Sequence, residues 1–127
     1  MVDGHRSLVL VVDDEALVRM DVVDMLNAVG YRTREASCAS EAIELLEQDP
    51  DIRVVFTDIQ MPGSMDGLAL SHYVRKRWPP TVIIISSGNR SPPQHDLPSD
   101  ADFIAKPFGR HEFGRVLKKV KFRLSTS

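Results

Sequence analysis

The chain has 127 residues, of which 43% are hydrophobic and 27% charged, and its formal net charge is −2. This composition is that of an ordinary globular protein, and the length suffices for one domain with a buried core, which we expect over residues 1–127 with its core from about 7 to 124. The small net charge excludes a general attraction to nucleic acid or membranes, and the single cysteine excludes an internal disulfide. No apolar run could span a bilayer, and no export signal is visible, so we expect a cytoplasmic protein with no membrane partner.

The first half of the chain alternates between apolar runs and helical patterns. Leu8–Val12 is continuously apolar, as in a strand covered on both faces. Asp14 is the expected N-cap of a helix that ends at Gly30. The inner face of that helix is predicted to be Leu17, Met20, Val23, Leu26 and Val29. A more polar strand over 31–36 suits a position near a sheet edge. Ser37 or Ser40 is the expected cap of the next helix, with Ala42, Leu45 and Leu46 inside.

The second half repeats this alternation. A strand over 53–57 leads into Asp58, and Asp66-Gly67 is predicted to start a helix that Pro79-Pro80 interrupts. Strands over 81–85 and 103–105 follow. Apolar residues at helical spacing mark a last helix: Phe113, Leu117, Val120 and Leu124.

The segment from residue 90 to 100 breaks the pattern because it contains Pro92, Pro93 and Pro98. An interior proline destabilises a helix by about 3 kcal/mol. We therefore expect at most one or two turns around Gln94–Leu97, or an irregular loop.

Alternating strands and helices predict an α/β fold, a parallel sheet with helices on both faces. Right-handed connections bring the carboxyl ends of all strands to one rim. Four apolar runs end there in polar residues, namely Asp13-Asp14, Asp58, Ser86-Ser87 and Lys106. We therefore expect these side chains to share one pocket.

The chemistry of this set favours a phosphoryl group. Three crowded carboxylates repel one another unless protons or a cation intervene, and an all-oxygen site suits Mg²⁺. Lys106 adds a positive charge and Ser86 a hydroxyl. A carboxylate can accept a phosphoryl group as an aspartyl phosphate.

The motifs, taken in order, resemble the receiver domain of bacterial two-component response regulators. They are Asp13-Asp14, Asp58 followed by Met61-Pro62, Asp66-Gly67, Ser86 and Lys106-Pro107-Phe108, within a match from Leu8 to about Leu124. The resemblance implies a flavodoxin-like, doubly wound five-stranded parallel sheet of order 2-1-3-4-5, here with an irregular or shortened fourth helix. It also implies a signalling module without an external substrate.

The resemblance further implies a role for each site residue. Asp58 would take a phosphoryl group from a phosphohistidine of a histidine kinase or phosphotransfer protein. Mg²⁺ would be held by Asp14, Asp58 and the backbone carbonyl of Gln60, with Asp13 acting largely through water. Lys106 and Ser86 would contact the phosphoryl group, and Phe103 would be the aromatic that turns inward when Ser86 moves. The Lys106-Pro107 peptide would be cis.

Two features depart from the family pattern. The loop over 61–67 is one residue longer than usual, which should alter the loop beside the metal more than the chemistry. The prolines between 90 and 100 affect the region that commonly carries the output signal, so the downstream partner is not indicated.

Other interpretations remain open for single pieces. Asp13-Asp14 alone could be a helix cap, Asp58 a loop acid and Phe103 a core residue. The basic last helix is interpreted as a solvated face rather than a nucleic-acid surface.

Two other functions compete with a phosphorylated signalling module, and a further hypothesis concerns assembly. One is a Mg²⁺-dependent phosphohydrolase or phosphotransferase that forms an aspartyl phosphate. Enzymes of the haloacid dehalogenase type require a second acid two residues after the nucleophile, and this position is Gln60 here. Another is a receiver-shaped binding protein that works without phosphate. The assembly hypothesis is a homodimer through the last helices.

Overall fold

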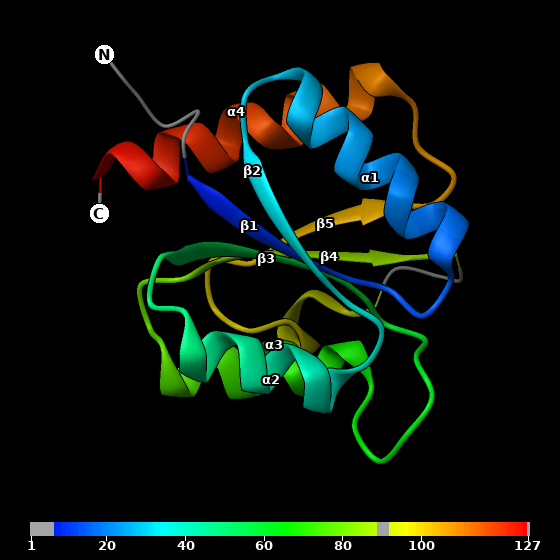
Figure 1. Cartoon of the computed structure of the whole chain (residues 1–127), viewed down its shortest axis with the longest axis vertical. Coiled ribbons are helices and arrows are strands. Elements are labelled where there is room, and N and C mark those ends of the chain that lie inside the picture. Colours follow the sequence, from blue (N-terminus) through cyan, green and yellow to red (C-terminus); the bar gives the residue numbers. More distant parts are fainter. Residues whose placement is uncertain (1–6, 89–91, 127) are drawn as a thin grey trace.

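The computed structural model describes residues 7–88 and 92–126, and it forms one sheet with helices on both faces (Figure 1). Its helices and strands are β1 Leu8–Val12, α1 Ala16–Ala28, β2 Arg32–Ala36, α2 Ala39–Gln48, β3 Ile52–Asp58, α3 Gly67–Arg77, β4 Val82–Ser87, the 3-10 turn η2 Gln94–Asp96, β5 Asp102–Ala105 and α4 Arg110–Thr126. None of the described helices has the length and apolar character needed to cross a bilayer.

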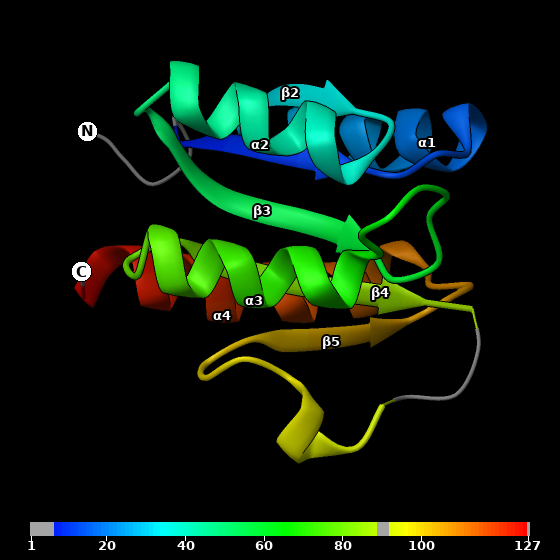
Figure 2. The same ribbon diagram turned by 90° about the horizontal axis from the view of Figure 1, so that it is seen from below.

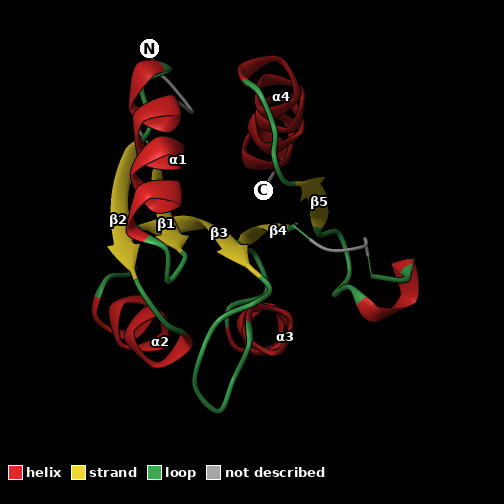
Figure 3. Cartoon of the chain, turned by 90° about the vertical axis from the view of Figure 1, so that its right-hand side faces the viewer, coloured by secondary structure: helices red, strands yellow, loops and turns green. Residues whose placement is uncertain are grey.

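The five strands are parallel and lie in the order β2-β1-β3-β4-β5, which confirms the predicted flavodoxin-like sheet. Figure 3 shows α1 and α4 on one face and α2 and α3 on the other. Two hydrophobic clusters result, one on each side of the sheet. The polar strand β2 lies at an edge, as expected.

Alternate residues of each strand face opposite clusters, because side chains in a strand have a period of two. Val54 and Phe56 of β3 lie in the cluster beneath α1 and α4, whereas Val55 lies in the cluster beneath α2 and α3. The continuous apolar runs therefore reflect strands covered on both faces. The same alternation also determines on which face of the sheet the first residue after each apolar run projects.

Helix α1 corrects the predicted inner face. Val22, Met25 and Leu26 are its buried residues, whereas Leu17 and Met20 are 81% and 54% exposed. The proposed set had a strict spacing of three, which falls about 60° short of a full turn at each step. Such residues wind around the helix and cannot all share one face. The prediction was therefore wrong for Leu17, Met20 and Val29, whereas Leu26 is buried and Val23 packs against the same cluster, as predicted.

Two predicted helix caps were also wrong. Helix α1 begins after Glu15 rather than Asp14, and α2 begins after Cys38, with Ser40 inside the helix. At the start of α1 the carboxylate of Asp13 accepts the backbone N–H of Glu15 at 2.9 Å. The predicted start of α3 at Asp66-Gly67 is confirmed, and Asp66 caps this helix by accepting the backbone N–H of Ala69 at 2.9 Å.

The proline-containing segment forms only η2, as its composition predicted; residues 90 and 91 of that prediction lie outside the described part. Figure 2 shows η2, the short yellow coil, below β5. Two side chains of α3 bind the backbone of the segment from η2 to Ser99. His72 Nε2 lies 2.6 Å from the carbonyl oxygen of Asp96, and Arg75 Nε donates to Ser99 at 2.9 Å. The segment that carries η2, in the place where the family has its fourth helix, is therefore held against α3.

Candidate functional site

The site arises where four strands end. In each of these strands, every second side chain faces α1 and α4. The polar residues that follow the last such apolar residue by two positions are Asp13 after Val11, Asp58 after Phe56, Ser86 after Ile84 and Lys106 after Ile104. Since the strands are parallel, these side chains meet at one rim, and Asp58 pairs in register with Ser86. The predicted convergence of the four strand ends is thus confirmed.

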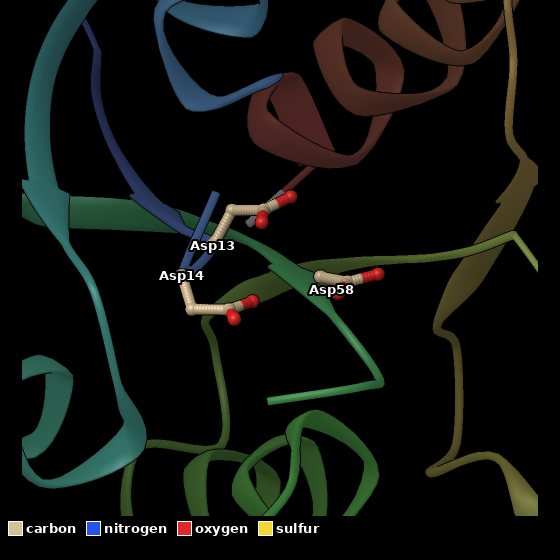
Figure 4. Close-up of side chains that lie close together, drawn as sticks. All are labelled: Asp13, Asp14 and Asp58. Carbon is tan, nitrogen blue, oxygen red and sulfur yellow. The ribbon is translucent and has the colours of Figure 1, made fainter. Parts of the chain in front are cut away.

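Three carboxylates form the acidic part of the site (Figure 4). One oxygen from each of Asp13, Asp14 and Asp58 lies within 4.8 Å of the others. Asp13 and Asp58 are buried, whereas Asp14 is exposed. A set of hard oxygen donors with one open side suits Mg²⁺.

Burial raises the pKa of Asp58 above its ordinary value, and the charges of Asp13 and Asp14 add to the increase. The ammonium group of Lys106 opposes it. An ionised Asp58 is therefore under electrostatic strain in the folded protein, and a bound cation would relieve this strain.

Lys106 lies between two of the acids. Its Nζ is 3.0 Å from Asp13 Oδ2 and 3.1 Å from Asp58 Oδ1, and its side chain is 16% exposed. Burial alone would lower the pKa of Lys106, but its close contacts with the carboxylates of Asp13 and Asp58 outweigh burial, and the pKa is raised. Lys106 is therefore a positive charge at neutral pH.

Two buried polar atoms of the described residues accept or donate no hydrogen bond, and both are in this site: Asp58 Oδ1 and Ser86 Oγ. The contact of Lys106 with Asp58 Oδ1 is a charge contact that lacks hydrogen-bond alignment. A buried hydroxyl left without a partner destabilises a fold by about 1–3 kcal/mol. Such a pair of unsatisfied atoms is suited to a ligand with several oxygens.

The backbone beneath Asp58 is packed closely against α3. The N–H of Gly67 donates to the carbonyl oxygen of Ile59 at 2.8 Å, and the N–H of Ile59 donates to that of Ser86 at 2.9 Å. A Cβ on Gly67 would lie 1.6 Å from the carbonyl oxygen of Asp58. Only glycine therefore allows α3 to begin directly against the end of β3.

Gln60 and Phe103 occupy less central positions. The side chain of Gln60 is exposed and accepts a hydrogen bond from Ser87, and its backbone carbonyl as a metal ligand stays a prediction. Phe103 is half-buried and packs on the cluster beneath α2 and α3, on the face of the sheet opposite Ser86. Its part in switching also stays a prediction. The Lys106-Pro107 peptide is cis, as expected.

Two supporting contacts were missed by the sequence analysis. Arg19 of α1 donates to the backbone carbonyl of Asp13 at 2.7 Å and pairs with Glu35 of β2 at 2.9 Å. Nothing in the sequence signals this contact, because it depends on how α1 lies over the sheet. Ser87 was visible only as a second hydroxyl at a strand end, without an indication of its partner.

A family model described as the response regulator receiver domain matches residues 9–118. The chain belongs to this family, and it is a receiver domain of the two-component response regulator type. The Mg²⁺-dependent phosphohydrolase that was considered as an alternative is not favoured by this assignment.

Similar proteins include the sensor kinase CckA of Brucella abortus, 35% identical over 118 residues, which cover 90% of this chain and 12% of the kinase. The transcriptional regulatory protein PdtaR of Mycobacterium tuberculosis is 38% identical over 104 residues, or 79% of this chain and 49% of PdtaR. The chain thus spans less than half the length of either relative. Among solved structures, the response regulator TrrA of Thermotoga maritima, in complex with Mg²⁺ and BeF, is 30% identical with a TM-score of 0.79, covering 90% of this chain and 98% of TrrA.

Proposed function

We propose that Asp58 is the phosphoacceptor of this receiver domain and that it takes a phosphoryl group from a phosphohistidine. The observation that carries the proposal is the meeting of three carboxylates, an ammonium group and an unpartnered hydroxyl at one rim. A nucleophilic carboxylate beside groups that can bind three phosphoryl oxygens is what this transfer requires.

In the transfer, a carboxylate oxygen of Asp58 forms a bond to phosphorus while the bond between phosphorus and the donor imidazole nitrogen breaks. The electron pair stays on that nitrogen, which can then take a proton. Lys106 Nζ, 3.1 Å from Asp58 Oδ1, would attract the phosphoryl oxygens, and the free hydroxyl of Ser86 would donate to one of them. No external substrate is needed beyond the phosphodonor.

The acidic cluster fits Mg²⁺. Asp13, Asp14 and Asp58 would hold it together with the backbone carbonyl of Gln60, and their closely spaced oxygens provide the donor chemistry for this ion. When bound, Mg²⁺ would supply positive charge against the phosphoryl oxygens. That TrrA was solved with Mg²⁺ and BeF supports the proposal by similarity.

The phosphodonor protein would lie against the exposed side of α1. Leu17 and Met20 are exposed there, and they line a groove of about 490 Å³ together with Lys106, Pro107 and Phe108. Because Lys106 also contacts Asp58, this groove leads to the phosphoacceptor. A helix carrying a phosphohistidine could bury its apolar side on this surface while its imidazole reaches Asp58.

Labelling with a small phosphodonor tests the proposal. Wild type incubated with Mg²⁺ and acetyl phosphate should gain the mass of one phosphoryl group, whereas Asp58→Asn should gain none. Asp49→Asn is the matched control, because Asp49 pairs with Arg34 on the surface and should not affect labelling. Equal labelling of wild type and Asp58→Asn would contradict the proposal.

The cytoplasmic location, a single domain over the whole chain and a homodimer stay predictions.

A further inference from the structure

A second hydroxyl at the end of β4 is directed away from Ser86. Ser87 is fully buried, and its Oγ donates to Oε1 of Gln60 at 2.9 Å. It continues the row of Ile83 and Ile85, which faces α2 and α3, whereas Ser86 continues the row that faces α1 and α4. Ser87 therefore contacts the chain that leaves β3, on the other side of the sheet from the unpartnered Ser86 hydroxyl.

The hydrogen bond from Ser87 holds Gln60, the last residue before the outward turn over residues 61–66. Ile59 is fixed through both of its backbone groups, by Ser86 on one side and Gly67 on the other. The chain then turns outward through residues 61–66, where Gly63 has a φ of 104°. Gln60 stands between the fixed residue and the turn, and its side chain ties it to β4 across 27 positions of sequence.

We propose that Ser87 is a positioning residue for magnesium, because it holds Gln60 and thereby the backbone that supplies the expected carbonyl ligand. The inference rests on the proposed function, since it concerns the same metal site. Mg²⁺ requires nearly ideal placement of its ligands, so a carbonyl held in place before binding raises the affinity. Loss of one ordinary hydrogen bond corresponds to a change of about two- to tenfold in the dissociation constant.

Isothermal titration calorimetry with Mg²⁺ tests the proposal on the whole chain. Ser87→Ala and Gln60→Met each remove the hydrogen bond but leave every backbone carbonyl in place. Each should weaken Mg²⁺ binding by about two- to tenfold, and the double variant should bind no more weakly than the weaker single variant. Ser87→Thr, which keeps the hydroxyl, should restore most of the affinity.

Ser71→Ala is the matched control for general destabilisation. Ser71 is also a fully buried serine, and its hydroxyl donates to the carbonyl oxygen of Leu68 within α3. Urea unfolding without Mg²⁺ should show a comparable loss of stability for Ser71→Ala and Ser87→Ala, while only Ser87→Ala alters the affinity for Mg²⁺.

The results separate this proposal from the proposed function. If wild type binds Mg²⁺ and Ser87→Ala binds it equally well, the role of Ser87 is refuted and the site stands. Additive losses in the double variant would also refute it, because they would show two independent effects. If wild type itself takes up no Mg²⁺, the metal site of the proposed function fails as well.

Discussion

Gly67→Ala is the substitution whose effect the structure defines most sharply. The new Cβ would lie 1.6 Å from the carbonyl oxygen of Asp58 and 2.6 Å from its carbonyl carbon. Real Cβ contacts essentially never fall below 3.0 Å, so the start of α3 and the end of β3 must separate by more than 1 Å. Both partners are backbone and cannot rotate away, and the 2.8 Å hydrogen bond from Gly67 to Ile59 would be stretched.

The expected loss of stability is about 2–3 kcal/mol, the middle of a range of about 1–4 kcal/mol. Overpacking contributes about 1–3 kcal/mol and the weakened hydrogen bond about 1 kcal/mol, and the better helix propensity of alanine offsets up to about 1 kcal/mol. For a domain of this size the melting temperature should fall by about 10 °C. Binding of Mg²⁺ should weaken as well, because the displaced backbone carries Asp58.

Urea unfolding followed by circular dichroism measures the first effect, with a lower midpoint and an unchanged slope. Gly114→Ala is the control, since Gly114 lies inside α4 and a Cβ there meets no atom within 4 Å. This variant should gain about 0.5–1 kcal/mol. If Gly67→Ala proved as stable as Gly114→Ala and bound Mg²⁺ normally, the close packing of α3 against Asp58 would be refuted.

Three further substitutions probe the site. The pKa of Asp58 is raised in the folded protein. Ionisation of Asp58 therefore reduces the stability of the fold as the pH rises from the ordinary pKa of 3.8 through the folded pKa. In urea at pH 7, Asp58→Asn should be more stable than wild type, and this advantage should disappear at pH values below 3.8. Ser86→Ala removes a buried hydroxyl without a hydrogen-bond partner. It should leave the free energy of unfolding in urea unchanged or raise it by up to about 1 kcal/mol. A marked loss of stability would show that this hydroxyl is hydrogen-bonded in solution. Arg19→Ala should lose about 1–2 kcal/mol of folding stability. It should also weaken Mg²⁺ binding in calorimetry, because the backbone carbonyl of Asp13 loses its hydrogen bond from Arg19. Glu35→Gln removes only the ion pair with Arg19 and should retain the affinity for Mg²⁺.

The strands and the rim residues could be predicted because their signals are local. Strand β1 has the predicted bounds Leu8–Val12, and β3 ends at Asp58, shortly before Met61-Pro62-Gly63, which cannot continue a strand. The period of two along each strand then determines that Asp13, Asp58, Ser86 and Lys106 project on one side. Neighbouring residues carry this information, so a single sequence contains it.

The contacts that complete the site depend on how these elements pack. Lys106 meets Asp13 across 93 positions, and Ser87 meets Gln60 across 27. A set of residues spaced by three could not form one face of α1, but which apolar residues of that helix become buried, namely Val22, Met25 and Leu26, is decided by the sheet beneath it. Such choices arise from side chains that are distant in sequence and become neighbours only when the sheet and helices have packed together.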